Sequence, residues 1–171
     1  MIQELADLKA SLLEGRYQDA LTLIEQLDGM SRQAKIDAIE SQLVRMLIHL
    51  VKNQLEQRLT NSWAASIRGA LVEIKRLNLQ DNRTSTYIKQ NEWQSLMEDA
   101  LESAISDASV EVFQGDYTPF QLSEMVDREA VILVGDSLID LTYRFSKKEL
   151  PNIVNQALMQ LPGGIAWGKG N

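Results

Sequence analysis

The sequence predicts an all-α protein, a single helical bundle of about seven helices with three long central helices at its core. Three observations lead to this prediction. Apolar residues recur every three or four positions along most of the chain, which is the spacing of one helix face. No stretch shows the alternation of apolar and polar residues that is typical of a strand. The 171 residues, 44% of them hydrophobic and 24% charged, are enough to bury one core without disulfides, which the lack of cysteine excludes.

The stretch from Ile36 to Leu59 is expected to be the central, mostly buried helix. Its apolar residues fall in two adjoining rows, at Ile36, Ile39, Leu43, Met46, Leu47 and Leu50, and at Val44, Ile48, Val51 and Leu55. Two such rows leave little more than one polar side on the helix. Ser31 is the expected cap at its start, and we expect it to end before Ser62, which would cap the next helix.

Two shorter helices are predicted before the central one, over Ile2–Glu14 and Tyr17–Leu27. Gly15 and then Asp28-Gly29 supply their stops. Because each helix has one apolar face, we expect a helical hairpin that packs across the core. The letters LLEGRYQDALTLIEQL resemble the first helix and turn of a tetratricopeptide unit, but no second copy follows at the roughly 34-residue period of such repeats.

Two long helices are expected after the central one. The first has an inner face at Trp63, Ile67, Ala70, Ile74 and Leu77. The second keeps helical spacing from Trp93 to Val112 and ends near Gly115. Between the two helices, Leu79 to Gln90 is rich in Asn, Asp, Ser and Thr, which predicts a polar and mobile connection.

Thr118 and Pro119 predict the start of another helix, since threonine is a good cap and proline is favoured at the first helical position. We expect that helix to continue to about Val134 and to break at Gly135. A further helix is predicted beyond the glycine, as far as about Lys148.

The chain is expected to form one helical domain over residues 1–161. Pro151 starts its last helix, which extends to Leu161. Residues 162–171 contain four glycines and one proline, so a flexible tail is predicted there.

Several runs of the sequence together resemble a known family. They are EGRYQDALTLIEQLDGMSR, the run LVRMLIHLVK at residues 43–52, Arg58, Ser62-Trp63 with Ile67, Arg68 and Ile74, and the acidic segment with ASVEVFQGDY. This set resembles the uncharacterised bacterial helical family known as the domain of unknown function numbered twenty-nine, over residues 1–134. The resemblance implies a compact all-helical bundle and no particular activity. Residues 135–161 are then a C-terminal helical extension.

The charges of the chain are unevenly distributed. The net charge of −7 argues against nucleic-acid binding over the whole surface, but residues 43–90 carry +5 and residues 91–142 carry −11. The candidate contacts for phosphate are the cations of the positive stretch, namely Arg58, Arg68, Lys75 and Arg76, with Arg83 and the ring of Trp63 nearby in the sequence. Trp63 is in phase with Ile67 and Ile74, which favours a core position over stacking on bases. The acidic helix after Trp93 is an alternative partner for the same cations within the fold.

His49 is the single histidine, and its ordinary pKa lies near neutrality. Arg45 and Asn53, four residues away on either side, cannot orient an imidazole as a carboxylate can, so we expect a histidine at the edge of the core that could also contact a partner. Carboxylates that could share a divalent cation form rows at Glu98, Asp99, Glu102, Asp107 and Glu111. Such rows are also common on a solvated helix face. We expect no catalytic residue, no bound metal and no cofactor.

The sequence favours a non-enzymatic protein-interaction or scaffold module, because no nucleophile, base and orienting group can be assembled. Protein is the expected partner, with self-association through residues 150–161. The alternatives are a nucleic-acid-associated protein that uses the basic residues and, third, a carboxylate metal-binding protein. No apolar run reaches the roughly 18 residues of a membrane span, and the start of the chain lacks the order of a signal peptide, so we expect a cytoplasmic protein without membrane contact.

Overall fold

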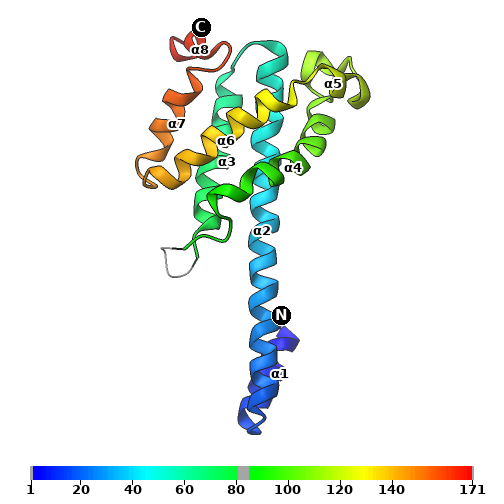
Figure 1. Cartoon of the computed structure of the whole chain (residues 1–171), viewed down its shortest axis with the longest axis vertical. Coiled ribbons are helices and arrows are strands. Elements are labelled where there is room, and N and C mark those ends of the chain that lie inside the picture. Colours follow the sequence, from blue (N-terminus) through cyan, green and yellow to red (C-terminus); the bar gives the residue numbers. More distant parts are fainter. Residues whose placement is uncertain (1, 81–84, 171) are drawn as a thin grey trace. The chain divides into compact units, whose positions relative to one another are not determined.

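A computed structural model describes residues 2–80 and 85–170 of the chain. Within these ranges the chain forms eight α-helices, two short 3-10 helices and no strand (Figure 1). The all-α prediction is confirmed, and the number of helices is close to the expected seven. Arg83, one of the basic residues named above, lies outside the described ranges.

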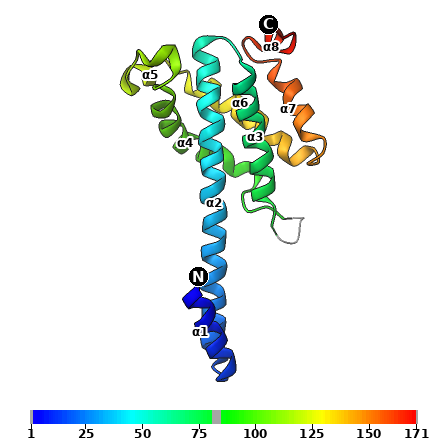
Figure 2. The same ribbon diagram turned by 180° about the vertical axis from the view of Figure 1, so that it is seen from behind.

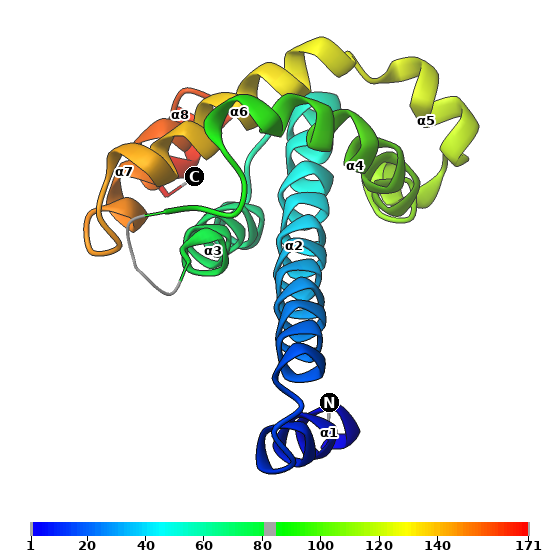
Figure 3. The same cartoon turned by 60° about the horizontal axis from the view of Figure 1, so that its bottom comes forward.

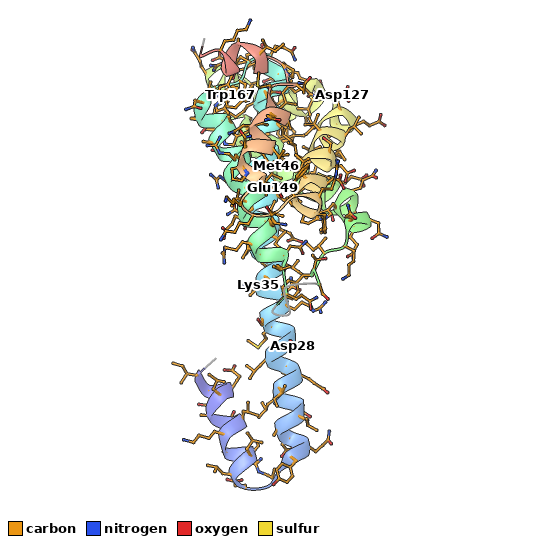
Figure 4. The ribbon with its side chains drawn as sticks, turned by 90° about the vertical axis from the view of Figure 1, so that its left-hand side faces the viewer. Asp28, Lys35, Met46, Asp127, Glu149 and Trp167 are labelled. Carbon is orange, nitrogen blue, oxygen red and sulfur yellow. The ribbon has the colours of Figure 1, made fainter. Side chains whose placement is uncertain are left out.

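The first compact unit ends at Asp37 and consists of α1 (Ile2–Leu13) and the first part of α2 (Tyr17–Glu56). Figure 4 shows the two helices side by side and antiparallel. Gly15 joins them with φ of 73°, a left-handed conformation that glycine adopts without steric penalty. The predicted hairpin and its stop at this glycine are therefore confirmed, while packing of the hairpin across the core stays a prediction.

Helix α2 continues through Asp28 and Gly29, where the sequence predicts a break. The expected new helix start at Ser31 is therefore wrong as well. A glycine ends a helix when it takes a left-handed conformation, as Gly15 does, whereas Gly29 keeps helical geometry. Glycine in a helix interior costs only about 1 kcal/mol relative to alanine, which favourable neighbours can offset.

The second compact unit begins at Ala38 and contains the rest of α2 and the remaining helices. Their bounds are α3 Asn61–Asn78, α4 Trp93–Ala108, α5 Pro119–Met125, α6 Arg128–Arg144, α7 Leu150–Leu158 and α8 Gly164–Gly168, with 3-10 helices η1 at Gln90–Glu92 and η2 at Val112–Gly115. Helix α6 contacts α3, α4 and α7. Figure 2 shows α3 beside this part of α2, and in Figure 3 α6 extends from the α5 side to α7.

The core of the second unit comes mainly from α2, α3 and α4, and α5, α6 and α7 add further buried side chains. Its largest fully buried side chains are Trp93, Ile39, Leu43, Met46, Leu47, Ile67, Leu71, Ile74, Met97, Leu101, Ile105 and Leu122. The inner face predicted for α3 is confirmed, since all five of its named residues are buried. The spacing of apolar residues predicts a core formed by the three helices before Val112, and α6 and α7 also contribute to it.

Thr60, and not Ser62, caps the start of α3. The Thr60 hydroxyl accepts a hydrogen bond from the backbone N–H of Trp63 at 3.1 Å, which is the usual N-cap arrangement. The prediction of a Ser62 cap is wrong by two residues, because α3 begins immediately after Thr60 and Ser62 already lies inside the helix.

Helix α5 starts as predicted, with Thr118 as cap and Pro119 at the first position. It ends much earlier than expected, because the chain becomes extended at Val126. Asp127 then caps α6, and its carboxylate accepts from the backbone N–H of Ala130 at 3.2 Å. The helix break is thus marked by a capping aspartate.

Gly135 lies in the interior of α6, and the break predicted there is wrong. A Cβ atom at this position would lie 2.7 Å from the sulfur of Met97 on α4 and 3.4 Å from the terminal carbon of Met46 on α2. Figure 4 labels Met46 within the second unit. The missing side chain therefore allows α6 to pack closely against the two methionines.

The hydroxyl of Tyr143 on α6 joins the end of α3 to the start of α4. It accepts from the indole N–H of Trp93 at 2.6 Å and from the side-chain amide of Asn78 at 3.0 Å. It donates to the carbonyl oxygen of Ile88 at 2.6 Å. Asn78 also accepts from the backbone N–H of Ile88 at 2.7 Å. Both backbone groups of Ile88, which lies just before α4, are therefore hydrogen-bonded, the carbonyl to Tyr143 and the N–H to Asn78.

Helix α7 turns its apolar side chains into the core, where Leu150, Val154 and Leu158 are buried. The chain then forms α8, in a region where the sequence predicts a flexible tail. The indole N–H of Trp167 on α8 donates to the side-chain oxygen of Asn61 at 3.2 Å. Among the helices of the described ranges, none is long and apolar enough to cross a membrane.

Candidate functional site

Two of the predicted basic contacts hold α3 to its neighbours. Arg68 donates to the side-chain oxygen of Asn155 on α7 at 2.8 Å, and Lys75 donates to the backbone carbonyl of Thr142 on α6 at 2.6 Å. Both hydrogen bonds are partly buried. These cations are therefore used within the fold.

The other two predicted contacts pair with nearby carboxylates. Arg76 forms an ion pair with Glu73 one turn earlier on α3, and Arg58 pairs with Glu56 at 3.0 Å. Both arginine side chains remain more than half exposed, so solvent screens their pairs.

Trp63 is buried and lies between two cations. Its ring centroid is 4.7 Å from Nζ of Lys52 and 4.6 Å from the guanidinium carbon of Arg58. Such cation–π contacts stabilise a positive charge against the negative face of the ring. The core position predicted for Trp63 is confirmed, and the ring is not presented as an open platform for nucleic-acid bases.

Lys52 is buried and forms an ion pair with Glu111, a residue between α4 and η2. The hydrogen bond from Lys52 holds the pKa of the Glu111 carboxyl below its usual value. Two left-handed residues, Phe113 and Gln114, follow in the chain, and the Phe113 backbone N–H donates to Glu56 at 3.4 Å. This turn fixes the segment that carries the carboxylate over the buried ammonium group.

His49 lies beside this ion pair, partly buried on α2. Burial, together with the nearby positive charge of Lys52, lowers the pKa of His49 to about 4. Its Nδ1 atom is buried and has no hydrogen-bond partner. The imidazole is thus neutral near pH 7. The Glu111 carboxylate lies close enough to act on its charge, but it is hydrogen-bonded to Lys52, and Nδ1 of the imidazole has no hydrogen bond that would orient it as a base.

The acidic residues of α4 do not pair with the four predicted cations in the contacts that the structure records. Glu102 instead pairs with Arg128 at the start of α6. Within residues 2–80 and 85–170, no group of three or more His, Asp or Glu side chains is placed to hold a metal ion.

The hairpin of the first unit exposes a row of apolar side chains on each helix. The residues of these rows are Ile2, Leu5 and Leu12 on α1, and Tyr17, Leu21 and Ile24 on α2; Leu13 and Met30 of the same unit are exposed as well. The seam between the two helices is filled by other residues, among them the buried Ser11 and Ala20. Viewed along each helix from its N-terminus, the exposed row is rotated away from the seam in the same direction on both helices. Because the two helices run in opposite directions, this places both rows on the same side of the hairpin. We call these six residues the apolar hairpin face.

The opposite side of the hairpin is a polar groove. Its lining includes Asp7, Arg16, Asp19, Thr22 and Gln26. Arg16 pairs with Asp19, three residues later in the chain, at 3.1 Å. The hairpin therefore has one apolar side and one polar side, as one layer of a larger helical bundle has.

The chain matches the family model described as Domain of unknown function DUF29 over residues 3–131. It belongs to this family. The resemblance predicted over residues 1–134 is thereby confirmed, and the match contains the hairpin, α3, α4 and α5 but not α7 or α8. No curated protein and no solved structure matches the chain.

The DUF29 family carries no assigned activity, so the candidate site is chosen on geometry alone. Sequence reasoning found the apolar rows of the hairpin but expected the core to cover them. It could not detect that the rows share one exposed side, because this depends on how the two helices pair. The spacing of Tyr17, Leu21 and Ile24, and of Ile2 and Leu5, was the available signal.

Proposed function

We propose that this DUF29 chain is a non-enzymatic protein-interaction module whose contact surface is the apolar hairpin face. The observation that carries the proposal is the exposure of all six residues, each between 47% and 88% exposed. Contiguous apolar patches of several hundred Å² on a protein surface mark interaction sites. A two-helix hairpin also has too few layers to bury such a face by itself.

The other predicted functions receive less support. Arg68 and Lys75 are engaged within the fold, which leaves two exposed arginines, Arg58 and Arg76, for contact with phosphate. Self-association through residues 150–161 also stays a prediction, but its main apolar side chains pack into the core. The cytoplasmic location remains an expectation.

The test compares two single substitutions that add the same charge to α2. Leu21→Glu places a carboxylate on the apolar hairpin face, and Gln26→Glu places one in the polar groove of the same helix. The tagged full-length wild type and both variants are used to copurify proteins from the source cells, and bound polypeptides, including untagged copies of the chain, are quantified by mass spectrometry.

We expect Gln26→Glu to retain the polypeptides bound by the wild type and Leu21→Glu to lose them, since a charge on a buried apolar contact is unpaired. Circular dichroism checks that both variants keep the helical content of the wild type. Equal binding by all three proteins would place the contact surface elsewhere and overturn the proposal.

A further inference from the structure

The apolar hairpin face has the arrangement of half a four-helix bundle. Each of two antiparallel helices contributes three apolar side chains, with Ile2, Leu5 and Leu12 on one and Tyr17, Leu21 and Ile24 on the other. A two-fold axis lying along the middle of such a face sets α1 of one copy against α2 of the other, so the same surface can pair with itself. The helices in the resulting bundle are all antiparallel to their neighbours, as in up-and-down bundles.

We infer that the apolar hairpin face binds the same face of a second copy of this chain, forming a four-helix bundle from two hairpins. This inference rests on the proposed function and names its partner. It makes the chain a homodimer held by α1 and the first turns of α2.

The size of the face matches that of a stable interface. Taking about 200 Å² for a large apolar side chain, the exposed fractions of the six residues correspond to roughly 700 Å² per copy. A standard-size interface buries roughly 600 to 1,000 Å² on each partner, so the six residues fall within this range if the pairing buries most of their exposed area.

The charges in the two rows also favour a second copy. Lys9 continues the row of Leu5 and Leu12 on α1, and Asp28 continues the row of Leu21 and Ile24 on α2. Both are exposed, and Figure 4 labels Asp28 on the hairpin part of α2. With one cation and one anion, the face has no net charge, so pairing brings no like-charge repulsion to its centre. A strongly basic or acidic partner would find no matching charge there.

The experiment measures the mass of the untagged full-length chain by sedimentation equilibrium over a wide range of concentrations. We expect the wild type to reach twice its 19.3 kDa mass at high concentration. Leu21→Glu should raise the dissociation constant by at least about 100-fold, because two-fold symmetry places the new charge in the interface twice. Leu5→Glu, on the other helix, should act in the same way, and Gln26→Glu should dimerise like the wild type.

A wild type that stays monomeric at every concentration would overturn the inference, and this measurement needs no variant to fold. A dimer that survives both Leu21→Glu and Leu5→Glu would place the interface elsewhere, for example at residues 150–161. The proposed function is tested separately. If the chain is a monomer but Leu21→Glu still abolishes the binding of copurified proteins, the apolar hairpin face binds a different partner. If neither mass nor copurification depends on Leu21, both proposals fail.

Discussion

Gly135 on α6 lies against Met97 on α4, so closely that a Cβ atom would approach the methionine sulfur to 2.7 Å. Replacing Gly135 by leucine should therefore force the buried methionine or the helix to move. We expect the free energy of unfolding to fall by about 1–3 kcal/mol, as for other overpacked cores. Urea denaturation of the full chain measures the change.

Gly29→Ala is the matched control for this prediction. Gly29 is also inside a helix, but nothing lies within 4 Å of the position that a Cβ would occupy. Alanine should stabilise α2 there by up to about 1 kcal/mol, since it has the higher helix propensity. If both substitutions changed stability in the same direction and amount, close packing at Gly135 would not be the explanation.

The cap of α3 gives a second prediction, which compares Thr60, the cap in the structure, with Ser62, the cap expected from the sequence. Thr60→Ala should lower the free energy of unfolding by about 1 kcal/mol, because the Trp63 backbone N–H loses its partner. Ser62→Ala should change it by less than about 0.5 kcal/mol, as at other sites without special contacts. Thermal denaturation of both variants decides the matter, and a larger effect at Ser62 would contradict the cap assignment.

His49 should make stability depend on pH. Its pKa is about 4 in the folded chain against an ordinary 6.5, so between these values the unfolded chain binds a proton that the folded chain does not. The free energy of unfolding should therefore be highest above pH 6.5 and fall as the pH drops towards 4. The full pKa difference corresponds to about 3 kcal/mol, and solvent around the partly exposed imidazole should reduce this to roughly 2 kcal/mol. His49→Phe should remove this part of the pH dependence in denaturation curves.

A direct measurement of the His49 pKa is simple because the chain has one histidine. Its imidazole signals in a proton NMR titration belong to this residue without further assignment. A midpoint near 6.5 in the folded protein would contradict the buried, neutral imidazole.

The pair of Lys52 and Glu111 should also make stability depend on pH, but over a lower pH range than His49 does. The folded pKa of Glu111 lies below 4.5, so its contribution is present above that pH and is lost as the pH falls through the lowered value. Glu111→Gln should cost about 1 kcal/mol at pH 7, since solvent around the exposed carboxylate weakens the pair. The difference from the wild type in urea denaturation should vanish below the lowered pKa.

Lys52→Met is the companion variant for that pair. It replaces the buried cation by an apolar side chain of similar length. The change should be close to neutral, because the Glu111 carboxylate that loses its partner is mostly exposed to solvent. A loss as large as that of Glu111→Gln would mean that the lost ion pair itself, rather than a buried ammonium group left without a partner, accounts for the effect.

The regular parts of the fold could be predicted from the sequence because apolar spacing reports directly on helix faces. The inner face of α3 and the start of α5 at Thr118 are examples. The helix breaks could not be predicted as well, because glycine has two different uses. Gly15 ends a helix with a left-handed conformation, whereas Gly135 permits close packing inside one.

The candidate site was harder to predict than the fold. The sequence shows that Leu21 and Ile24 share a helix face, but their exposure depends on what packs against them. In the same way, the sequence shows that Arg68 and Lys75 are cations, but their hydrogen bonds to α7 and α6 depend on how these helices pack against α3. The burial of a side chain and its hydrogen-bond partners depend on how the helices pack, and the spacing of residues along the sequence does not determine them.

The single phenolic oxygen of Tyr143 has a consequence for how the protein opens. The Trp93 indole proton is shared directly with this oxygen, while the Ile88 amide proton is held by Asn78, which bonds the same oxygen. Exposing one of these protons to solvent removes support from the other, so the two should exchange with deuterium at similar rates. The end of α3 and the beginning of α4 would then unfold locally as one cooperative segment, although the chain between them is long.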